Sequence, residues 1–157
     1  MLGYRMPREP STPRIAVWRR LRRLGAAQPL DGLALLPETP RTREALEWVA
    51  ERVLAAAGTA TTWTATHSSA ADERALIETM NAAITAEYAG LASAAADAGA
   101  QPDEEPAALR RTATRLARVL AEIQARDYFG APGRRQAEKA VTALLTAAKA
   151  TGKAAVR

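Results

Sequence analysis

Cysteine is absent from the 157-residue chain, and histidine occurs only once, as His67. The absence of cysteine excludes disulfides, thiolate metal sites, iron–sulfur clusters and thiol redox chemistry within this sequence. A single histidine excludes a metal site built from several histidines. Neither a nucleophile elbow nor a glycine-rich phosphate loop accompanies it. We therefore predict a protein that is not an enzyme, with no catalytic residues, no metal site and no cofactor.

Aromatic residues and long apolar runs are also scarce. Aromatic side chains make up only 4% of the chain, whereas hydrophobic residues make up 48% and are largely alanine. That content supports a folded core of closely packed helices with little buried area per residue. No run approaches the roughly 18–20 apolar residues that span a bilayer, and the first residues lack the apolar segment of a signal peptide. We predict a cytoplasmic protein with no membrane partner.

Positive charge is concentrated at the start of the chain. The net charge is +5 overall, yet residues 1–25 carry seven arginines against a single acidic residue, Glu9. This segment therefore has a net charge of +6, and the remaining residues sum to −1. Such asymmetry predicts a surface for nucleic acid, phosphate or an oxyanion. The alternative is a generally arginine-rich protein in which these side chains are simply solvated.

Proline, glycine and apolar residues mark the first elements of a sheet domain. Residues 2–6 are typical of a short strand, and residues 12–25 of a helix that begins with a Thr-Pro pair and ends at a glycine. Residues 30–37 predict a hairpin, because an Asp-Gly pair separates two apolar segments. Pro29 indicates that the first strand of this hairpin is short or lies at an edge.

A second helix and a last strand complete this domain. Residues 39–58 begin with Thr-Pro, carry apolar residues at helical spacing and end at a glycine. Residues 59–66 are β-branched around a central tryptophan, which is typical of a strand. The order β-α-β-β-α-β predicts a ferredoxin-like domain at residues 1–67, with two helices on one face of a four-stranded antiparallel sheet. The predicted fold class is therefore α+β.

The second half of the chain has helical spacing throughout. Apolar stripes at about 72–98, 109–123 and 137–148 predict three helices. We assign residues 68–157 to a three-helix C-terminal extension, which either packs on the sheet domain or forms a homodimer. The three tryptophans of the chain are spaced like core or interface residues, and we expect them to pack.

Three sequence blocks resemble those of a known family. Residues 4–26 combine a proline-rich loop with a helix of the form R-x-x-x-W-R-x-L-x-x-L-G-A, which begins at Arg14. Residues 31–51 and residues 127–140 are similar to the second and the distal block. In their order and spacing these blocks resemble the N-terminal domain of the ChrB-type chromate-resistance regulators. Longer members of that family continue into a second domain, which we expect this chain to lack.

The resemblance carries expectations about fold and function. It implies a transcription-associated regulator of a chromate-efflux operon, which responds to chromate and acts on DNA. The domain is also similar to the Cas2-like, ferredoxin-like module of PaaX-type repressors, in agreement with the strand and helix order above. The alternative function is a small accessory protein that binds an oxyanion or metabolite and makes no DNA contact. A helical scaffold that dimerises through residues 109–123 is a further alternative.

The first candidate site is a row of arginines on the helix predicted at 12–25. At 100° per residue, Arg19, Arg20 and Arg23 face away from the apolar side of that helix. They could meet successive phosphates of duplex DNA, a contact that depends on salt and tolerates any sequence. The alternative is a solvated helix face. No helix-turn-helix, zinc finger or RNP-type motif accompanies them, so base-specific readout is not predicted.

Two further candidate sites are loops. The first precedes the helix, where free N–H groups and arginines would suit a tetrahedral anion such as chromate; its residues are Arg5, Arg8, Ser11, Thr12 and Arg14. The alternative is that Thr12 simply caps the helix. The second follows residue 126 and offers Tyr128, Arg134 and Arg135. There the alternative is that the aromatic residues anchor one helix on another.

Overall fold

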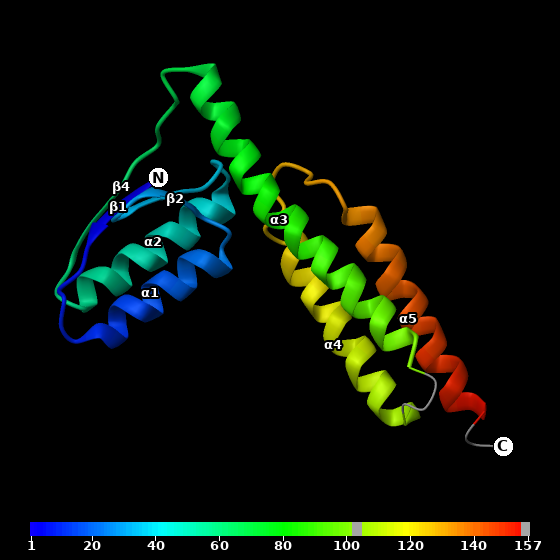
Figure 1. The fold of residues 1–157 in the computed structure, drawn as a ribbon. Coiled ribbons are helices and arrows are strands. Elements are labelled where there is room, and N and C mark those ends of the chain that lie inside the picture. Colours follow the sequence, from blue (N-terminus) through cyan, green and yellow to red (C-terminus); the bar gives the residue numbers. More distant parts are fainter. Residues whose placement is uncertain (102–104, 155–157) are drawn as a thin grey trace. The chain divides into compact units, whose positions relative to one another are not determined.

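The computed structural model describes residues 1–101 and 105–154, and the chain divides into two compact units. Met1–Leu76 form the first, here called the sheet unit, and Ile77–Arg157 form the second, here called the helical unit (Figure 1). The α+β class is confirmed, with most of the described residues in helices. In chain order the elements are β1 (Leu2–Arg5), α1 (Ser11–Arg23), β2 (Ala27–Leu30), β3 (Leu33–Leu35), α2 (Pro40–Ala55), β4 (Thr59–Thr62), α3 (Ala70–Gly99), α4 (Pro106–Gln124) and α5 (Arg134–Ala154).

The sheet unit consists of a four-stranded antiparallel sheet with two helices on one side (Figure 1). The strand order is β2-β3-β1-β4, so that β1 lies inside the sheet with Leu2 opposite both Ala34 and Thr62. Alternation along β1 buries Leu2 against the helices. The buried core consists of Leu2, Val17, Leu21, Ala34, Leu46, Val49 and Val53.

Both helices of the sheet unit end in a Schellman motif, in which two backbone N–H groups bond back to the last turn. In α1 the left-handed residue is Gly25, as the sequence predicted. In α2 it is Ala57, with φ +57°, and the predicted Gly58 instead donates its N–H to the Val53 carbonyl over 2.9 Å. The prediction for the second helix was therefore wrong by one residue.

The N-termini of the two helices differ although both carry Thr-Pro. Thr39 caps α2 as predicted, because its side chain accepts the Thr42 N–H while the Thr42 hydroxyl accepts the Thr39 N–H. The predicted cap at Thr12 is wrong, since α1 begins at Ser11 after Pro10, which makes no side-chain cap. Proline fits several positions of a first turn, where N–H groups have no intrahelical partner, so Pro13 did not fix the start.

The last strand is shorter than the sequence predicted. β4 ends at Thr62, and its ladder with β1 closes where the Trp63 N–H and the Met1 amino group each donate to the other's carbonyl over 2.9 Å. The tryptophans do not lie in the core, since Trp18, Trp48 and Trp63 are 46%, 59% and 49% exposed, and the alternative placement at an interface stays a prediction. Smaller neighbours such as Val17 and Val49 fill the core instead.

The helical unit is built from α4, α5 and the part of α3 that follows Leu76. All three predicted apolar stripes contribute to one buried cluster, centred on Tyr88, Leu116 and Leu144. The stripe at 109–123 is therefore covered within the chain, which removes it as a scaffold surface, and a homodimer stays a prediction. In the described part of the chain, no helix has both the length and the apolar character needed to cross a membrane.

Candidate nucleic-acid interface

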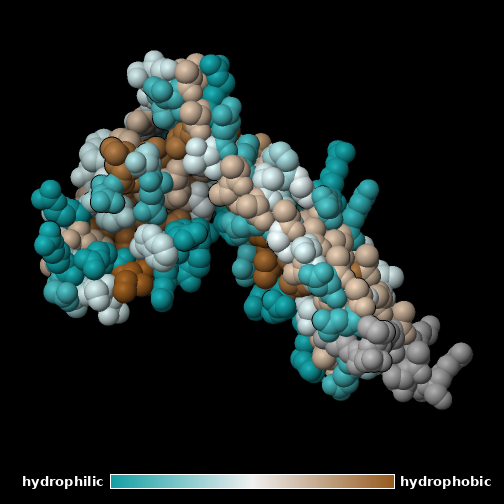
Figure 2. Space-filling model, in the orientation of Figure 1, coloured by the Kyte–Doolittle hydropathy of each residue, from teal (hydrophilic) through white to brown (hydrophobic). Residues whose placement is uncertain are grey.

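The first basic surface is the α1 arginine face, defined as Arg19, Arg20 and Arg23. All three side chains are exposed, while Val17 and Leu21 on the opposite side of α1 are buried in the core. Among the described residues, no carboxylate lies within 4.0 Å of these guanidinium groups. Figure 2 shows mainly hydrophilic side chains over α1, interrupted by isolated hydrophobic ones. Helix and core together therefore hold three unneutralised positive charges toward solvent.

Arg22 extends this surface in a way that sequence reasoning missed. Its guanidinium lies 5.2 Å from the ring centroid of the half-exposed Trp18, a cation–π contact. The i, i+4 spacing of the two residues was the available signal.

A structural role also accounts for part of this cluster. Arg20, Arg22 and Arg23 lie in the last turn of α1, where the negative end of the helix dipole favours cations. Each such charge contributes about 0.3–1 kcal/mol at an exposed position. Arg19 lies outside that turn, so the dipole accounts for the cluster only in part.

The predicted anion loop is only partly assembled. The Arg14 guanidinium donates to the Arg8 carbonyl over 3.2 Å, which closes the loop onto the start of α1. Ser11 and Thr12 occupy the first turn of α1, and Arg5 is the exposed last residue of β1. Direct contact thus joins Arg8 and Arg14 alone among the five predicted residues, and the guanidinium of Arg14 is turned to the backbone.

The segment between α4 and α5, residues 125–133 and here called the distal loop, takes part in a partly buried hydrogen bond that the sequence did not reveal. Tyr88 is 0% exposed, and its hydroxyl donates to Asp127 Oδ2 over 3.0 Å. Asp127 Oδ1 accepts the Ala131 N–H over 2.8 Å, so one carboxylate fixes the turn of the loop and also binds α3 through Tyr88. Burial, with the adjacent Asp127 carboxylate, raises the pKa of Tyr88 to about 12. No local signal could have found a pair 39 residues apart.

The predicted residues of this loop are placed around that bond. Arg134 donates to Glu138 Oε1 over 3.0 Å, and the same oxygen accepts Gln124 Nε2 over 2.8 Å, which links α4 to α5. Tyr128 packs edge-on against Phe129, with ring centroids 6.5 Å apart. Arg135 is exposed in the first turn of α5. Arg134 and Arg135 are thus neighbours at the start of α5, where Arg134 donates to Glu138 and Arg135 is exposed to solvent.

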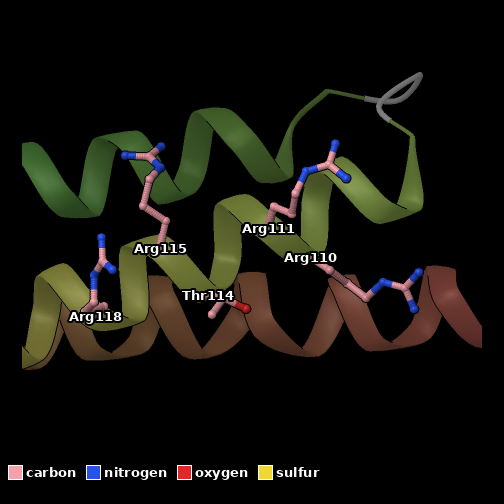
Figure 3. A pocket seen from close by; sticks show the side chains of 5 residues that line it. All are labelled: Arg110, Arg111, Thr114, Arg115 and Arg118. Atoms are coloured by element: carbon pink, nitrogen blue, oxygen red, sulfur yellow. The ribbon is translucent and has the colours of Figure 1, made fainter.

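A second basic surface, also missed by the sequence, lies on α4. The α4 arginine face consists of Arg110, Arg111, Arg115 and Arg118, which together with Thr114 line an open hollow of about 490 Å³ (Figure 3). The available signal was phase, because these positions lie on the helix side opposite the buried stripe. Within the described residues, no three potential metal-ligating side chains are grouped together.

Comparison with known proteins gives one match. The family model described as "Protein ChrB, N-terminal" matches residues 14–153, which is nearly the whole chain. No curated protein matches the sequence, and no solved structure matches the fold.

Proposed function

The chain belongs to the family of ChrB N-terminal domains, and from this membership we propose that it is a transcription-associated regulatory protein linked to chromate resistance. We propose further that it binds duplex DNA through the α1 arginine face. The family supplies the link to chromate, and the surface supplies the DNA contact. Both parts can be tested on the same purified chain.

One observation carries the DNA proposal. The α1 arginine face projects three exposed guanidinium groups from a single turn and a half of helix, with no carboxylate within 4.0 Å among the described residues. Arginine forms charge-assisted, often bidentate hydrogen bonds with phosphate. Such contacts position a protein on DNA and carry no base information.

The sheet unit supports the proposed relationship to ferredoxin-like regulatory modules. Its elements follow the order β-α-β-β-α-β, and its strands follow the order β2-β3-β1-β4 with antiparallel neighbours. In a sheet of this kind both helices pack on one face, and the outer side of α1 is left to solvent. We propose that this unit is ferredoxin-like and presents α1 to DNA.

Fluorescence anisotropy with labelled duplex DNA from the chain's own upstream region tests the proposal. The variant R19Q/R20Q/R23Q should bind about 10- to 100-fold more weakly than the natural sequence at about 0.1 M salt, because three phosphate contacts are lost. The matched control R41Q/R74Q/K139Q removes three exposed positive charges from α2, α3 and α5, and should bind within about threefold of the natural sequence. Equal losses of affinity in both variants would show that net charge alone determines DNA binding, and would overturn the assignment to α1.

Chromate is then added to the preformed complex, with sulfate as the control. Release of DNA by chromate at concentrations where sulfate has no effect would support regulation by chromate. Calorimetric binding of chromate by a chain that binds no DNA at any salt concentration would favour the alternative, an oxyanion-binding accessory protein. In that outcome Arg8 and Arg14 become the first residues to substitute.

A further inference from the structure

The α4 arginine face lies outside the apolar core of the helical unit. Its arginines lie opposite the buried residues Leu109, Ala113 and Leu116, so they make no contribution to the apolar cluster. In the described residues only Arg118 has a carboxylate partner, Glu122 at 3.8 Å, and both side chains are mostly exposed. Four positive charges are thus held along one side of a helix with little to neutralise them.

The helix dipole of α4 does not stabilise these arginines. Arg110 and Arg111 lie in the second turn of a helix that begins at Pro106. The positive end of the helix dipole is at the N-terminus, where cations are disfavoured. The last turn of α4, where cations would stabilise the helix, contains no basic residue. The arrangement is the opposite of that in α1.

The geometry does not suit a single small anion. In Figure 3, Arg111 and Arg115 extend toward α3, whereas Arg110 extends toward α5. A tetrahedral oxyanion needs donors that converge on one point, and these side chains diverge over a hollow of about 490 Å³. An extended ligand with many separated charges fits a divergent set of donors better.

Charge density distinguishes the extended ligands. Residues 110–118 of α4 span about 12 Å of helix, at about 1.5 Å per residue. Duplex DNA carries one negative charge about every 3.4 Å along each strand, so one strand offers roughly three to four phosphates over that length. An extended acidic peptide presents side chains on one face only about every 6.6 Å, or roughly two over the same length. Four arginines are matched by DNA and exceed what such a peptide offers.

We infer that the α4 arginine face binds the phosphate backbone of duplex DNA, as a second contact surface in addition to α1. The inference rests on the proposed function only in taking DNA as the partner. It assigns to the helical unit a binding role of its own, beyond that of the sheet unit. The contact tolerates any sequence, because guanidinium groups on phosphate read no base edges.

The test measures DNA affinity of the full chain by anisotropy over a salt series. The variant R110Q/R111Q/R115Q removes the three α4 arginines that have no carboxylate partner and leaves Arg118 in place. We expect the slope of log affinity against log salt to become shallower by about 2.7, at about 0.9 per lost contact. Affinity at about 0.1 M salt should fall about 10- to 100-fold. The lysine variant R110K/R111K/R115K should keep most of the slope, and circular dichroism should show all variants folded.

The outcomes separate this inference from the proposed function. If R110Q/R111Q/R115Q binds like R41Q/R74Q/K139Q while R19Q/R20Q/R23Q loses affinity, the α4 inference is overturned and the proposed function stands. If the natural sequence binds no duplex even at low salt, both are overturned. If polyglutamate displaces the DNA at equal charge concentration, the α4 face binds acidic chains in general and the commitment to DNA is wrong.

Discussion

The sheet unit and the helical unit are held together by different kinds of groups. In the sheet unit, strand ladders, two Schellman motifs and a tight hairpin turn satisfy the backbone, and the core is apolar apart from the buried Thr42 beside the α2 cap. Among the described residues of the helical unit, side chains provide polar links between the elements, with Asp127 and Glu138 each accepting two hydrogen bonds. The sheet unit should therefore be sensitive to backbone conformation, and the helical unit to single carboxylates.

The largest effect expected from this comparison is at Asp127. D127A leaves the buried Tyr88 hydroxyl and the Ala131 N–H without their acceptor, which should lower the free energy of unfolding by about 3 kcal/mol. Urea unfolding followed by circular dichroism measures the change. D97A is the control, because Asp97 is exposed on α3 and should change stability by less than about 0.5 kcal/mol. Equal effects of the two variants would contradict the role given to Asp127.

The second largest effect is at the hairpin of the sheet unit. Gly32 has φ +75°, and an added Cβ would lie 2.3 Å from the backbone oxygen of Tyr4. G32A should therefore cost about 2 kcal/mol or more, from left-handed strain and displacement of β1. Thermal unfolding measures the loss. A variant as stable as the natural sequence would contradict the expectation that the sheet unit is sensitive to backbone conformation.

An effect of opposite sign is expected at the end of α2. Ala57 adopts φ +57° in the Schellman motif, which costs an L-residue with a Cβ roughly 1–2 kcal/mol relative to glycine. A57G should raise the free energy of unfolding by about 0.5–1 kcal/mol, after the entropy of glycine in the unfolded chain is subtracted. The same unfolding assay applies. A destabilised A57G would show that Ala57 contributes packing that outweighs its strain.

The last expected effect is a dependence on alkaline pH in the helical unit. Burial and Asp127 raise the pKa of Tyr88 to about 12, above the usual value near 10. A raised folded-state pKa contributes stability that is complete below about pH 10 and is lost as the pH rises toward about 12. The difference in stability between the natural sequence and Y88F should therefore shrink over that window. A constant difference from pH 9 to pH 12 would contradict this account.

Much of the fold could be predicted from short sequence patterns, because the start and the end of a helix depend on residues that are close in the sequence. Thr39 next to Pro40 predicted a helix start, and the structure contains the capping box that this pair favours. Gly25 predicted the end of α1 because the left-handed conformation there costs glycine least. The tryptophans were expected in a core or an interface, and they lie outside the core. Their size and hydrophobic character did not predict burial, because smaller neighbours already fill the core.

For the candidate surfaces, too, the sequence predicted only what residues near one another in the chain determine. Net charge over residues 1–25 revealed the arginines of α1, since acidic residues are almost absent there. It concealed those of α4, because Asp103, Glu104, Glu105 and Glu122 cancel the four arginines in a sum over residues 103–122. The bond between Tyr88 and Asp127 depends on the packing of α3 against a distant loop, which no window of sequence contains.

The proposed DNA binding depends on phosphate contact by the α1 arginine face, and one measurement tests that contact most directly. Duplex affinity of the natural sequence and of R19Q/R20Q/R23Q is measured from about 0.05 to 0.3 M salt. We predict a steep linear loss of log affinity with log salt for the natural sequence, and a slope shallower by about 2.7 for the variant. Parallel lines for the two proteins, or a flat line for the natural sequence, would contradict the proposed function.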